Sequence, residues 1–279
     1  MFAARPAPIQ VTAWGHATGT GEPTIDYLLA DPVMIPVEVR HLFAERIHDL
    51  PCVSIIEPPP AAFRSPDAPV TANGYVSYGV FNRTSKISND AIAVWARILR
   101  SDVTARLTIK DFGIDDVSIR SMLQDKFASH GIAQDRLQLI GSTTREEHLA
   151  AYRQVDICLD PFPQGGGVST WEALHMGVPV VAKIGNAPPK RLGGAILSAI
   201  GLADRVATDD DQYVDIALRS TPDQLRTLRR ELSDLISARC GPTAYTRAVE
   251  EGYRTMWKTR CEAIHRAADI SAPPLTPAC

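Results

Sequence analysis

The sequence has little net charge, no long apolar run and no pattern that would direct it out of the cell. Its 29 Lys and Arg residues nearly balance its 32 Asp and Glu residues, and the net charge of -3 gives no basis for expecting nucleic acid or an anionic membrane as a partner. No apolar run approaches the roughly 20 residues that cross a bilayer, and no charged segment followed by an apolar one marks a signal peptide. These absences predict a cytoplasmic protein without nucleic-acid or membrane partners.

Cysteine does not occur in the arrangements that bind metals or form disulfides. The five cysteines are scattered, odd in number and never spaced as CxxC, which predicts reduced thiols and no zinc site. Aromatic residues make up only 6% of the chain, whereas apolar residues make up 45% of its 279 residues. That apolar share is enough for a core in one large domain, or in one domain and a fragment of another.

One stretch, residues 157–181, carries the clearest pattern of a ligand-binding site in the sequence. It begins with a short apolar run, continues through two prolines and the glycines Gly165, Gly166 and Gly167, and predicts a helix capped near Ser169 before a second apolar run. Glycines let backbone N–H groups approach a ligand without a Cβ in the way, and the positive end of the helix dipole points to the same place. The stretch therefore predicts a strand, a phosphate-binding loop, a helix and a strand.

Glu172 follows the predicted helix start by three residues and has two interpretations. In the first turn of that helix, its carboxylate lies near enough to the loop to accept hydrogen bonds from a sugar diol beside the phosphate. The same spacing from Ser169 also fits a capping box, which holds the helix start and binds no ligand. The spacing leaves both interpretations open, and one side chain can serve both.

The chain after residue 72 alternates between apolar runs and amphipathic segments. Strand, helix and strand at these lengths predict right-handed crossovers and an α/β fold with a doubly wound parallel sheet. Ligands bind beyond the carboxyl ends of such strands, so the loops after Phe81, Ile140, Leu159 and Ala182 are candidate site positions. The predicted strands cover residues 76–81, 107–109, 137–140, 157–159 and 180–182, and the predicted helices cover residues 90–99, 117–130, 146–155, 169–176, 192–200, 210–218, 222–237 and 244–265.

Composition divides the chain into five parts. Residues 1–57 offer strands at 9–14 and 26–30 and a helix at 37–48, too few elements for a stable sheet, and we expect them to be the remnant of an N-terminal domain. Residues 58–72 form a proline-rich linker. The parts that follow are a predicted ligand-binding domain (73–240), a long C-terminal helix (241–268) and a disordered tail (269–279).

Four stretches of the sequence resemble one protein family. They read RPAPIQVTAWGHATGTGEPTIDYLLADP, FNRTSKISNDAIAVWARIL, TTREEHLAAYRQVDICLDPFP and DPFPQGGGVSTWEALHMGVPVV, and they cover most of residues 5–260. The chain is similar to the C-terminal catalytic region of the protein O-GlcNAc transferases and their bacterial SPINDLY-type relatives. The resemblance implies the Rossmann-like donor-binding half of a two-domain GT-B glycosyltransferase, with an N-terminal truncation that leaves only part of the first domain.

The resemblance also assigns roles to residues in the candidate loops. Lys86 is the implied catalytic residue, because its ammonium would contact the diphosphate and stabilise the charge on departing UDP. The backbone of Thr143 would face the uracil edge, and the ring of His148 would pack against the uridine. The other implied residues are Gly19 and Gly21 near the sugar, and Asn82, Arg83, Arg145, Gly166, Gly167, Val168, Ser169 and Glu172 around the donor. His16 is a weaker catalytic candidate, because it is the only titratable residue of its loop but stands where the family commonly has an aromatic residue.

Several of these residues also have purely structural explanations. Lys86 can be a solvated lysine ahead of a helix cap at Ser88, and Thr144 with Glu147 has the spacing of a capping box. The run of three aspartates from Asp209 precedes a predicted helix, so we interpret it as an acidic helix cap and not as a metal site.

The resemblance implies transfer of N-acetylglucosamine, or another hexose, from a UDP-sugar to a Ser or Thr hydroxyl of a protein. Inversion by direct displacement is implied, without a metal or cofactor. Two alternatives stay open: an acceptor that is a small molecule, a glycan or an asparagine amide, and a non-catalytic UDP-binding module. The expected partners are the UDP-sugar, a protein or glycan acceptor, and a separate N-terminal half if the first domain resides on another chain.

Overall fold

The larger part of the structure is built on a six-stranded, all-parallel sheet. The computed structural model describes residues 1–14 and 18–271. The strands lie in the order β6-β5-β4-β7-β8-β9, which confirms the predicted doubly wound sheet and adds one short strand that the sequence did not suggest. The order reverses between β4 and β7, and this reversal leaves a crevice at the carboxyl ends of both strands. The strands are β4 (Ser77–Val80), β5 (Arg106–Lys110), β6 (Leu137–Ile140), β7 (Ile157–Leu159), β8 (Val180–Lys183) and β9 (Val206–Ala207).

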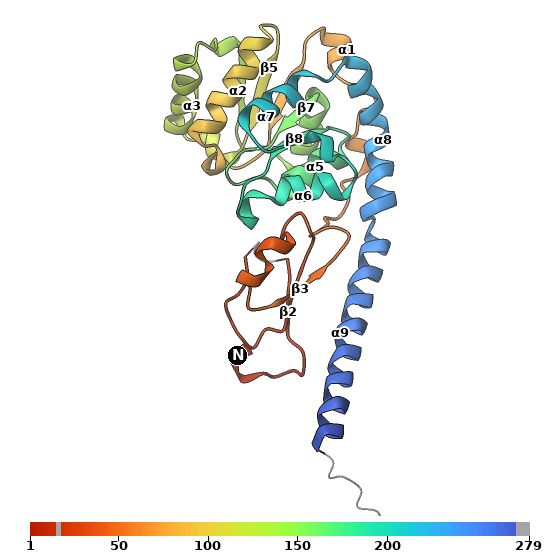
Figure 1. Cartoon of the computed structure of the whole chain (residues 1–279). Helices are drawn as coiled ribbons and strands as arrows, with labels where there is room; N and C mark the ends of the chain where they lie inside the picture. Colours follow the sequence, from red (N-terminus) through yellow and green to blue (C-terminus); the bar gives the residue numbers. More distant parts are fainter. Residues whose placement is uncertain (15–17, 272–279) are drawn as a thin grey trace, which may run out of the picture.

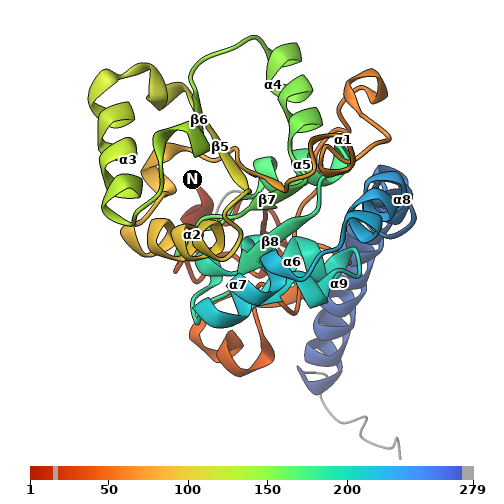
Figure 2. The same cartoon turned by 90° about the horizontal axis from the view of Figure 1, so that it is seen from above.

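Helices cover both faces of this sheet (Figure 2). One buried cluster joins the sheet to α2, α3 and α7 around Trp95, and a second joins it to α4, α5, α6 and α8 around Trp171. Both indole rings are almost fully buried, so each cluster withdraws a large apolar surface from water. The helices are α2 (Asn89–Ser101), α3 (Val117–Ser129), α4 (Arg145–Ala151), α5 (Val168–His175), α6 (Leu192–Ala199), α7 (Asp210–Leu218) and α8 (Pro222–Cys240).

Short 3-10 turns complete the connections between these elements. They are η1 (Phe2–Ala4), η2 (Val37–Leu42), η3 (Ala61–Phe63), η4 (Thr84–Lys86), η5 (Phe112–Asp115), η6 (Gln134–Arg136), η7 (Tyr152–Gln154), η8 (Pro188–Lys190) and η9 (Ala203–Arg205). Three of them, η4, η5 and η8, lie in loops at the carboxyl ends of the strands of the large sheet.

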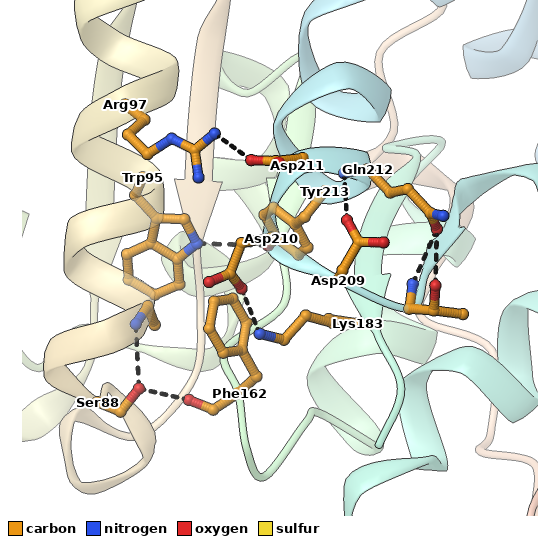
Figure 3. Close-up of polar contacts among 12 residues, drawn as sticks. Ser88, Trp95, Arg97, Phe162, Lys183, Asp209, Asp210, Asp211, Gln212 and Tyr213 are labelled. Carbon is orange, nitrogen blue, oxygen red and sulfur yellow. Dashed lines mark hydrogen bonds and ion pairs between the residues drawn. The ribbon is translucent and has the colours of Figure 1, made fainter. Parts of the chain in front are cut away.

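Side-chain caps fix the helix starts that matter for the site (Figure 3). The Ser88 hydroxyl accepts the Ala91 N–H at the start of α2 and donates to the Phe162 carbonyl at 2.6 Å, so it ties the loop after β4 to the loop after β7. Asp209 accepts the Gln212 N–H at the start of α7. The predicted caps at Ser88 and Asp209 are therefore confirmed.

The N-terminal segment contains a second parallel sheet, ordered β1-β2-β3. The predicted helix over residues 37–48 is wrong: η2 occupies its first half, and β3 pairs with β2 in its second half. The reason is that only Val39 among the apolar side chains of η2 packs against an apolar cluster, whereas Val37 and Leu42 are 70% and 73% exposed. The strands are β1 (Val11–Thr12), β2 (Tyr27–Ala30) and β3 (Arg46–Asp49).

This small sheet packs against α6 and against the last helix, α9 (Pro242–Ser271) (Figure 1). The Arg191 guanidinium, at the start of α6, donates to the Val33 carbonyl, and the Trp14 indole donates to the Tyr245 hydroxyl at 2.6 Å. A small apolar cluster joins Leu28, Ala30, Met34 and Ile35 to Ala195 of α6. Contacts with α6 and with α9 therefore hold the N-terminal segment in place.

The linker and the tail differ in part from what composition suggests. Residues 58–72 include η3 and the first turns of α1 (Val70–Asn73), and they are fixed to the large sheet. The predicted disordered tail is wrong for residues 269–271, which continue α9, while residues 272–279 lie outside the described residues. Within residues 1–14 and 18–271, no helix is both long and apolar enough to span a bilayer.

Asp156 anchors the linker to the sheet, and its loss is expected to destabilise the fold. Its buried carboxylate accepts the N–H groups of Val70 and Ser77, both at 2.9 Å. The Asp156→Ala variant leaves two buried donors unpaired, so we expect urea unfolding at neutral pH to show a loss of about 2 to 4 kcal/mol. Removing the exposed carboxylate of Asp125 by Asp125→Ala is the matched control and should cost less than about 0.5 kcal/mol. Equal losses in the two variants would contradict the anchoring role.

Candidate functional site

Loops at the carboxyl ends of β4, β5 and β6 enclose a cavity of about 530 Å³. Four of the predicted donor-binding residues line it: Arg83, Thr143, Arg145 and His148. A cavity of this size at this edge of a parallel sheet has the dimensions of a small-molecule site. The structure thus brings together residues that lie as many as 65 positions apart in the sequence, from 83 to 148.

Glu172 lies at the inner end of this group and joins two of these residues. Its side chain is 7% exposed, and its two oxygens accept from Arg145 Nη1 at 2.6 Å and from His148 Nε2 at 3.2 Å. Burial acts to raise the pKa of Glu172, but the hydrogen bonds from His148 and Arg145 outweigh it and hold the pKa below its usual value. Glu172 is therefore an ionised acceptor in a partly buried pocket.

The start of α5 differs by one residue from the prediction. The helix begins at Val168 with Gly167 as its N-cap, and no side chain caps it. The proposed capping box between Ser169 and Glu172 is wrong, because the Ser169 hydroxyl instead accepts from Asn82 Nδ2 at 2.8 Å. The physical cause is that Arg145 and His148 outcompete the backbone for Glu172. The capping box between Thr144 and Glu147, by contrast, is present at the start of α4.

The imidazole of His148 packs against two aromatic rings. It meets Phe81 and Tyr152 edge to face, with ring centroids 5.6 Å and 5.8 Å away, and these two rings stack on each other at 4.1 Å. The Tyr152 hydroxyl reaches the carbonyl of Ser169 at 3.4 Å. His148 therefore has a fixed orientation at the wall of the cavity that it lines.

Lys86, in η4, reaches from the loop after β4 to the glycine loop. Its Nζ donates to the Gly165 carbonyl at 2.8 Å. Burial lowers the pKa of Lys86, the nearby carboxylate of Asp160 acts to raise it, and the charge of Arg83 lowers it further. The lysine is thus a partly desolvated cation beside the loop that the sequence predicts to bind phosphate.

Asp160 lies in the candidate site, and the sequence analysis did not select it. It follows β7 directly, and its buried carboxylate accepts the Gly166 N–H at 2.8 Å and the Thr170 hydroxyl at 3.4 Å. Burial raises the pKa of Asp160 to about 6, although the Gly166 N–H and the charge of Lys86 act to lower it. The available signal was a carboxylate at the end of an apolar strand, since such a position in a parallel sheet faces the ligand edge.

The same carboxylate explains why the loop is made of glycines. A Cβ on Gly165 or Gly166 would lie 2.6 Å from an oxygen of Asp160, and a Cβ on Gly167 would lie 2.9 Å from Leu192. Close packing against Asp160 therefore favours glycine at positions 165 and 166, in addition to the ligand access that the sequence suggests, whereas at 167 the flexible Leu192 side chain can shift.

The N-terminal candidates are not brought to this cavity by any described contact. Gly19 packs against Phe43 and Glu45, because a Cβ there would lie 2.8 Å from Glu45 Oε2. Gly21 has a φ of +66° with open space around it, as a tight turn requires. His16 lies outside the described residues. The predicted roles of these three residues near the donor sugar stay predictions.

The aspartates at the start of α7 are neutralised by neighbouring cations (Figure 3). Asp210 accepts from Lys183 at 2.5 Å, Asp211 accepts from Arg97 at 2.6 Å, and Lys183 also lies 3.7 Å from the centre of the Phe162 ring. In the part of the chain that the structure describes, these aspartates included, no group of three or more His, Cys, Asp or Glu residues gathers as metal ligands do.

The sheet order and the position of the cavity define an α/β domain of Rossmann type. The model of glycosyl transferase family 41 matches residues 67–243, which is more than half of the chain. The chain therefore belongs to glycosyl transferase family 41.

Similar proteins extend this result beyond the matched domain. A probable UDP-N-acetylglucosamine–peptide N-acetylglucosaminyltransferase SPINDLY from Petunia hybrida is 36% identical over 270 residues, which are 94% of this chain and 29% of the relative. The SEC enzyme of the same description from Arabidopsis thaliana is 23% identical over 278 residues, again 94% of this chain and 28% of the relative. The chain thus spans less than a third of the length of these relatives.

Solved structures agree with the family assignment. A mutant O-GlcNAc transferase from Thermobaculum terrenum superimposes with a TM-score of 0.84 and 33% identity, over 94% of this chain and 51% of that one. A sucrose-phosphate synthase from Thermosynechococcus elongatus, at 15% identity and a TM-score of 0.59, covers 84% of this chain and 59% of its own and shares the fold alone.

The raised pKa of Asp160 leads to a pH-dependent prediction. Its folded-state pKa of about 6 lies above the usual 3.8, so the folded protein holds this proton more tightly than the unfolded chain does. The resulting stabilisation is complete below the unfolded pKa and is lost as pH rises through about 6, a change of roughly 3 kcal/mol. We expect wild-type stability to fall by that amount relative to an Asp160→Asn variant between about pH 4 and pH 7.

Urea unfolding of both proteins across this pH range measures the difference. The control compares wild type with Asp125→Asn, in which an exposed carboxylate is changed. The stability difference between these two proteins should not change comparably with pH. A stability difference between wild type and Asp160→Asn that stays constant with pH would show that Asp160 keeps its charge throughout.

Proposed function

We propose that this chain is the donor-binding part of an enzyme that transfers N-acetylglucosamine from UDP-N-acetylglucosamine to Ser or Thr side chains of proteins. The observation that carries the proposal is the cluster of Glu172, Arg145 and His148, placed beside the glycine loop and Lys86 in a chain of family 41. A UDP-sugar presents a base, a diol and a diphosphate, and this arrangement offers a separate contact for each.

The uridine is assigned to the cavity of about 530 Å³. The imidazole of His148, which the contacts with Phe81 and Tyr152 hold in place at the wall of this cavity, suits a pyrimidine as a packing partner. The backbone of Thr143 lines the same cavity and would face the uracil edge. The ionised Glu172 is the acceptor for the ribose hydroxyls, and the 56% exposed Arg145 can turn away when they bind.

The diphosphate is assigned to the space between Lys86 and the start of α5. The first N–H groups of α5 have no side-chain cap, so they are available to an anion together with the positive end of the helix dipole. Asn82 orients Ser169 at this helix start, and Lys86 can exchange the Gly165 carbonyl for a phosphate oxygen. An ammonium held there would stabilise the charge that develops on departing UDP.

Inversion without a metal follows from this assignment as part of the proposal. Lys86 and the backbone donors of the glycine loop supply the positive charge that a divalent ion would otherwise provide, and a direct displacement requires the acceptor hydroxyl in line behind the anomeric carbon. A UDP-sugar is then the donor substrate and no cofactor takes part. A separate N-terminal half as a partner stays a prediction.

Binding of UDP tests the assignment of Glu172. We expect calorimetry to show that Glu172→Ala weakens UDP binding by roughly 1 to 3 kcal/mol, because a charge-assisted hydrogen bond in a partly buried pocket is lost. The matched control is Glu231→Ala, which removes a carboxylate from the exposed face of α8 and should leave the affinity unchanged. Thermal unfolding of each variant confirms that it is folded. Equal affinity in wild type and Glu172→Ala would restrict Glu172 to a structural role.

Transfer itself is expected to be slow for these 279 residues. Among the described residues that line the cavity, His148 is already engaged by Glu172, and the Asp111 carboxylate accepts from the N–H and the hydroxyl of Thr84, so both groups are already engaged there. Lost general acid–base catalysis typically costs 10²- to 10⁴-fold, so we expect less than about 1% of the rate of the Thermobaculum enzyme.

The assay incubates the chain with radiolabelled UDP-N-acetylglucosamine and bacterial lysate proteins, with and without EDTA. We expect weak labelling that EDTA does not change and that Lys86→Ala abolishes. Labelling that needs added magnesium would overturn the metal-free mechanism. Intact UDP binding without any Lys86-dependent labelling would favour the non-catalytic UDP-binding alternative.

A further inference from the structure

A second and larger cavity, of about 670 Å³, lies at the opposite edge of the large sheet. Its walls come from the amino ends of β4, β5 and β6, from α1 in the linker, and from η6 and η7. In Figure 1, α1 lies at the far end of the molecule from the N-terminal sheet. None of the donor-site residues named above lines this cavity.

The floor of this cavity is a strand face of unusual polarity. Strands in parallel sheets are usually apolar on both faces, because helices cover both. In β5, however, Leu107 and Ile109 are fully buried on one face, whereas Arg106 and Thr108 point to the other and line the cavity. The Thr108 hydroxyl pairs with the amide oxygen of Gln138 on β6 at 3.0 Å. This face is therefore built to meet polar groups and not a covering helix.

Three arginines from three different elements surround this floor. Arg106 Nη1 donates to the Asp135 carbonyl at 2.7 Å, and its guanidinium lies 5.1 Å from the centre of the Tyr75 ring. Arg153 Nε donates to the Phe63 carbonyl at 2.8 Å. Arg136 donates to the carbonyls of Leu99, Asp102 and Ala105. Backbone carbonyls thus fix the position of each guanidinium without neutralising its charge.

These charges are not compensated by acidic partners within the described part of the chain. None of the ion pairs between described residues includes Arg106, Arg136 or Arg153. Among the residues that line the cavity, Asp135 alone carries a carboxylate. Three fixed cations and one anion leave an excess of positive charge around a polar, open pocket.

We propose that this cavity is a second binding site, for a small phosphorylated sugar or a similarly hydroxylated phosphate ester. Planar guanidinium groups match the geometry of phosphate oxygens, and their prior fixation lowers the entropy cost of binding. The hydroxyl of Thr108 and the amide of Gln138 supply donors and acceptors for sugar hydroxyls. A volume of about 670 Å³ accommodates such a ligand with water to spare.

The two cavities share one strand. Arg106 lines the second cavity at the amino end of β5, and Lys110 lines the donor cavity at its carboxyl end. Four residues of extended strand separate them by about 13 Å, so both ligands can bind at once.

The test is calorimetric titration of the folded chain with glucose 6-phosphate, in the absence and in the presence of excess UDP. We expect a dissociation constant below about 1 mM in both cases. The double variant Arg106→Gln/Arg153→Gln should weaken binding by roughly tenfold or more, because two charged donors are lost. Arg226→Gln, which removes an exposed arginine on α8, should not change it. Titration with inorganic phosphate should give weaker binding than the sugar ester does.

Several results would overturn the proposal. The first is that glucose 6-phosphate does not bind. The second is that the double variant binds it as tightly as wild type does. The third is that Arg83→Gln or UDP weakens its binding, which would place the ligand in the donor cavity. If inorganic phosphate binds as tightly as the ester does, the cavity does not recognise the sugar, and the proposal of a phosphorylated-sugar site is wrong. Thermal unfolding checks that the double variant is folded; if it is not, the single variant Arg106→Gln, at an exposed position, provides the same comparison.

Discussion

One buried group, the carboxylate of Asp160, fixes the loops of the candidate site at the carboxyl ends of the large-sheet strands. It holds the glycine loop through the Gly166 N–H, it limits the loop to residues without a Cβ, and it lies near the ammonium of Lys86. A buried carboxylate without such partners would be costly, so loop, lysine and aspartate stabilise one another. The crevice between β4 and β7 provides the place for this group, because the strand order reverses there.

The large sheet could be predicted from the sequence because its strands are short apolar runs separated by amphipathic helices of typical length. The N-terminal segment could not, since only Val39 among the apolar positions of residues 37–42 packs against an apolar cluster, and Val37 and Leu42 stay exposed. There the pairing of β3 with β2 decided the outcome. Hydrogen bonds between distant segments override local spacing, and a single sequence does not reveal them.

The same distinction applies to the candidate site. The glycine loop and the cap at Thr144 are local patterns, and both appear where the sequence places them. The contacts of Glu172 are not local: its spacing from Ser169 fits a capping box, yet its partners come from α4, more than twenty residues earlier in the chain. Asp160 escaped notice for a related reason, because its importance arises from burial, which only the packed sheet creates.

The break between α8 and α9 has a mechanical consequence. Helix α8 packs on α5 of the large sheet, whereas α9 contacts the small sheet through Tyr245 with Trp14 and through Gly252, which lies against His48. Gly241, whose backbone is extended, is the joint between the two helices. Through Tyr245 and Met256, however, α9 also shares a buried cluster with α5, α6 and α8, so it links the small sheet to the large one, and Gly241 is the point where the chain turns from one helix into the next.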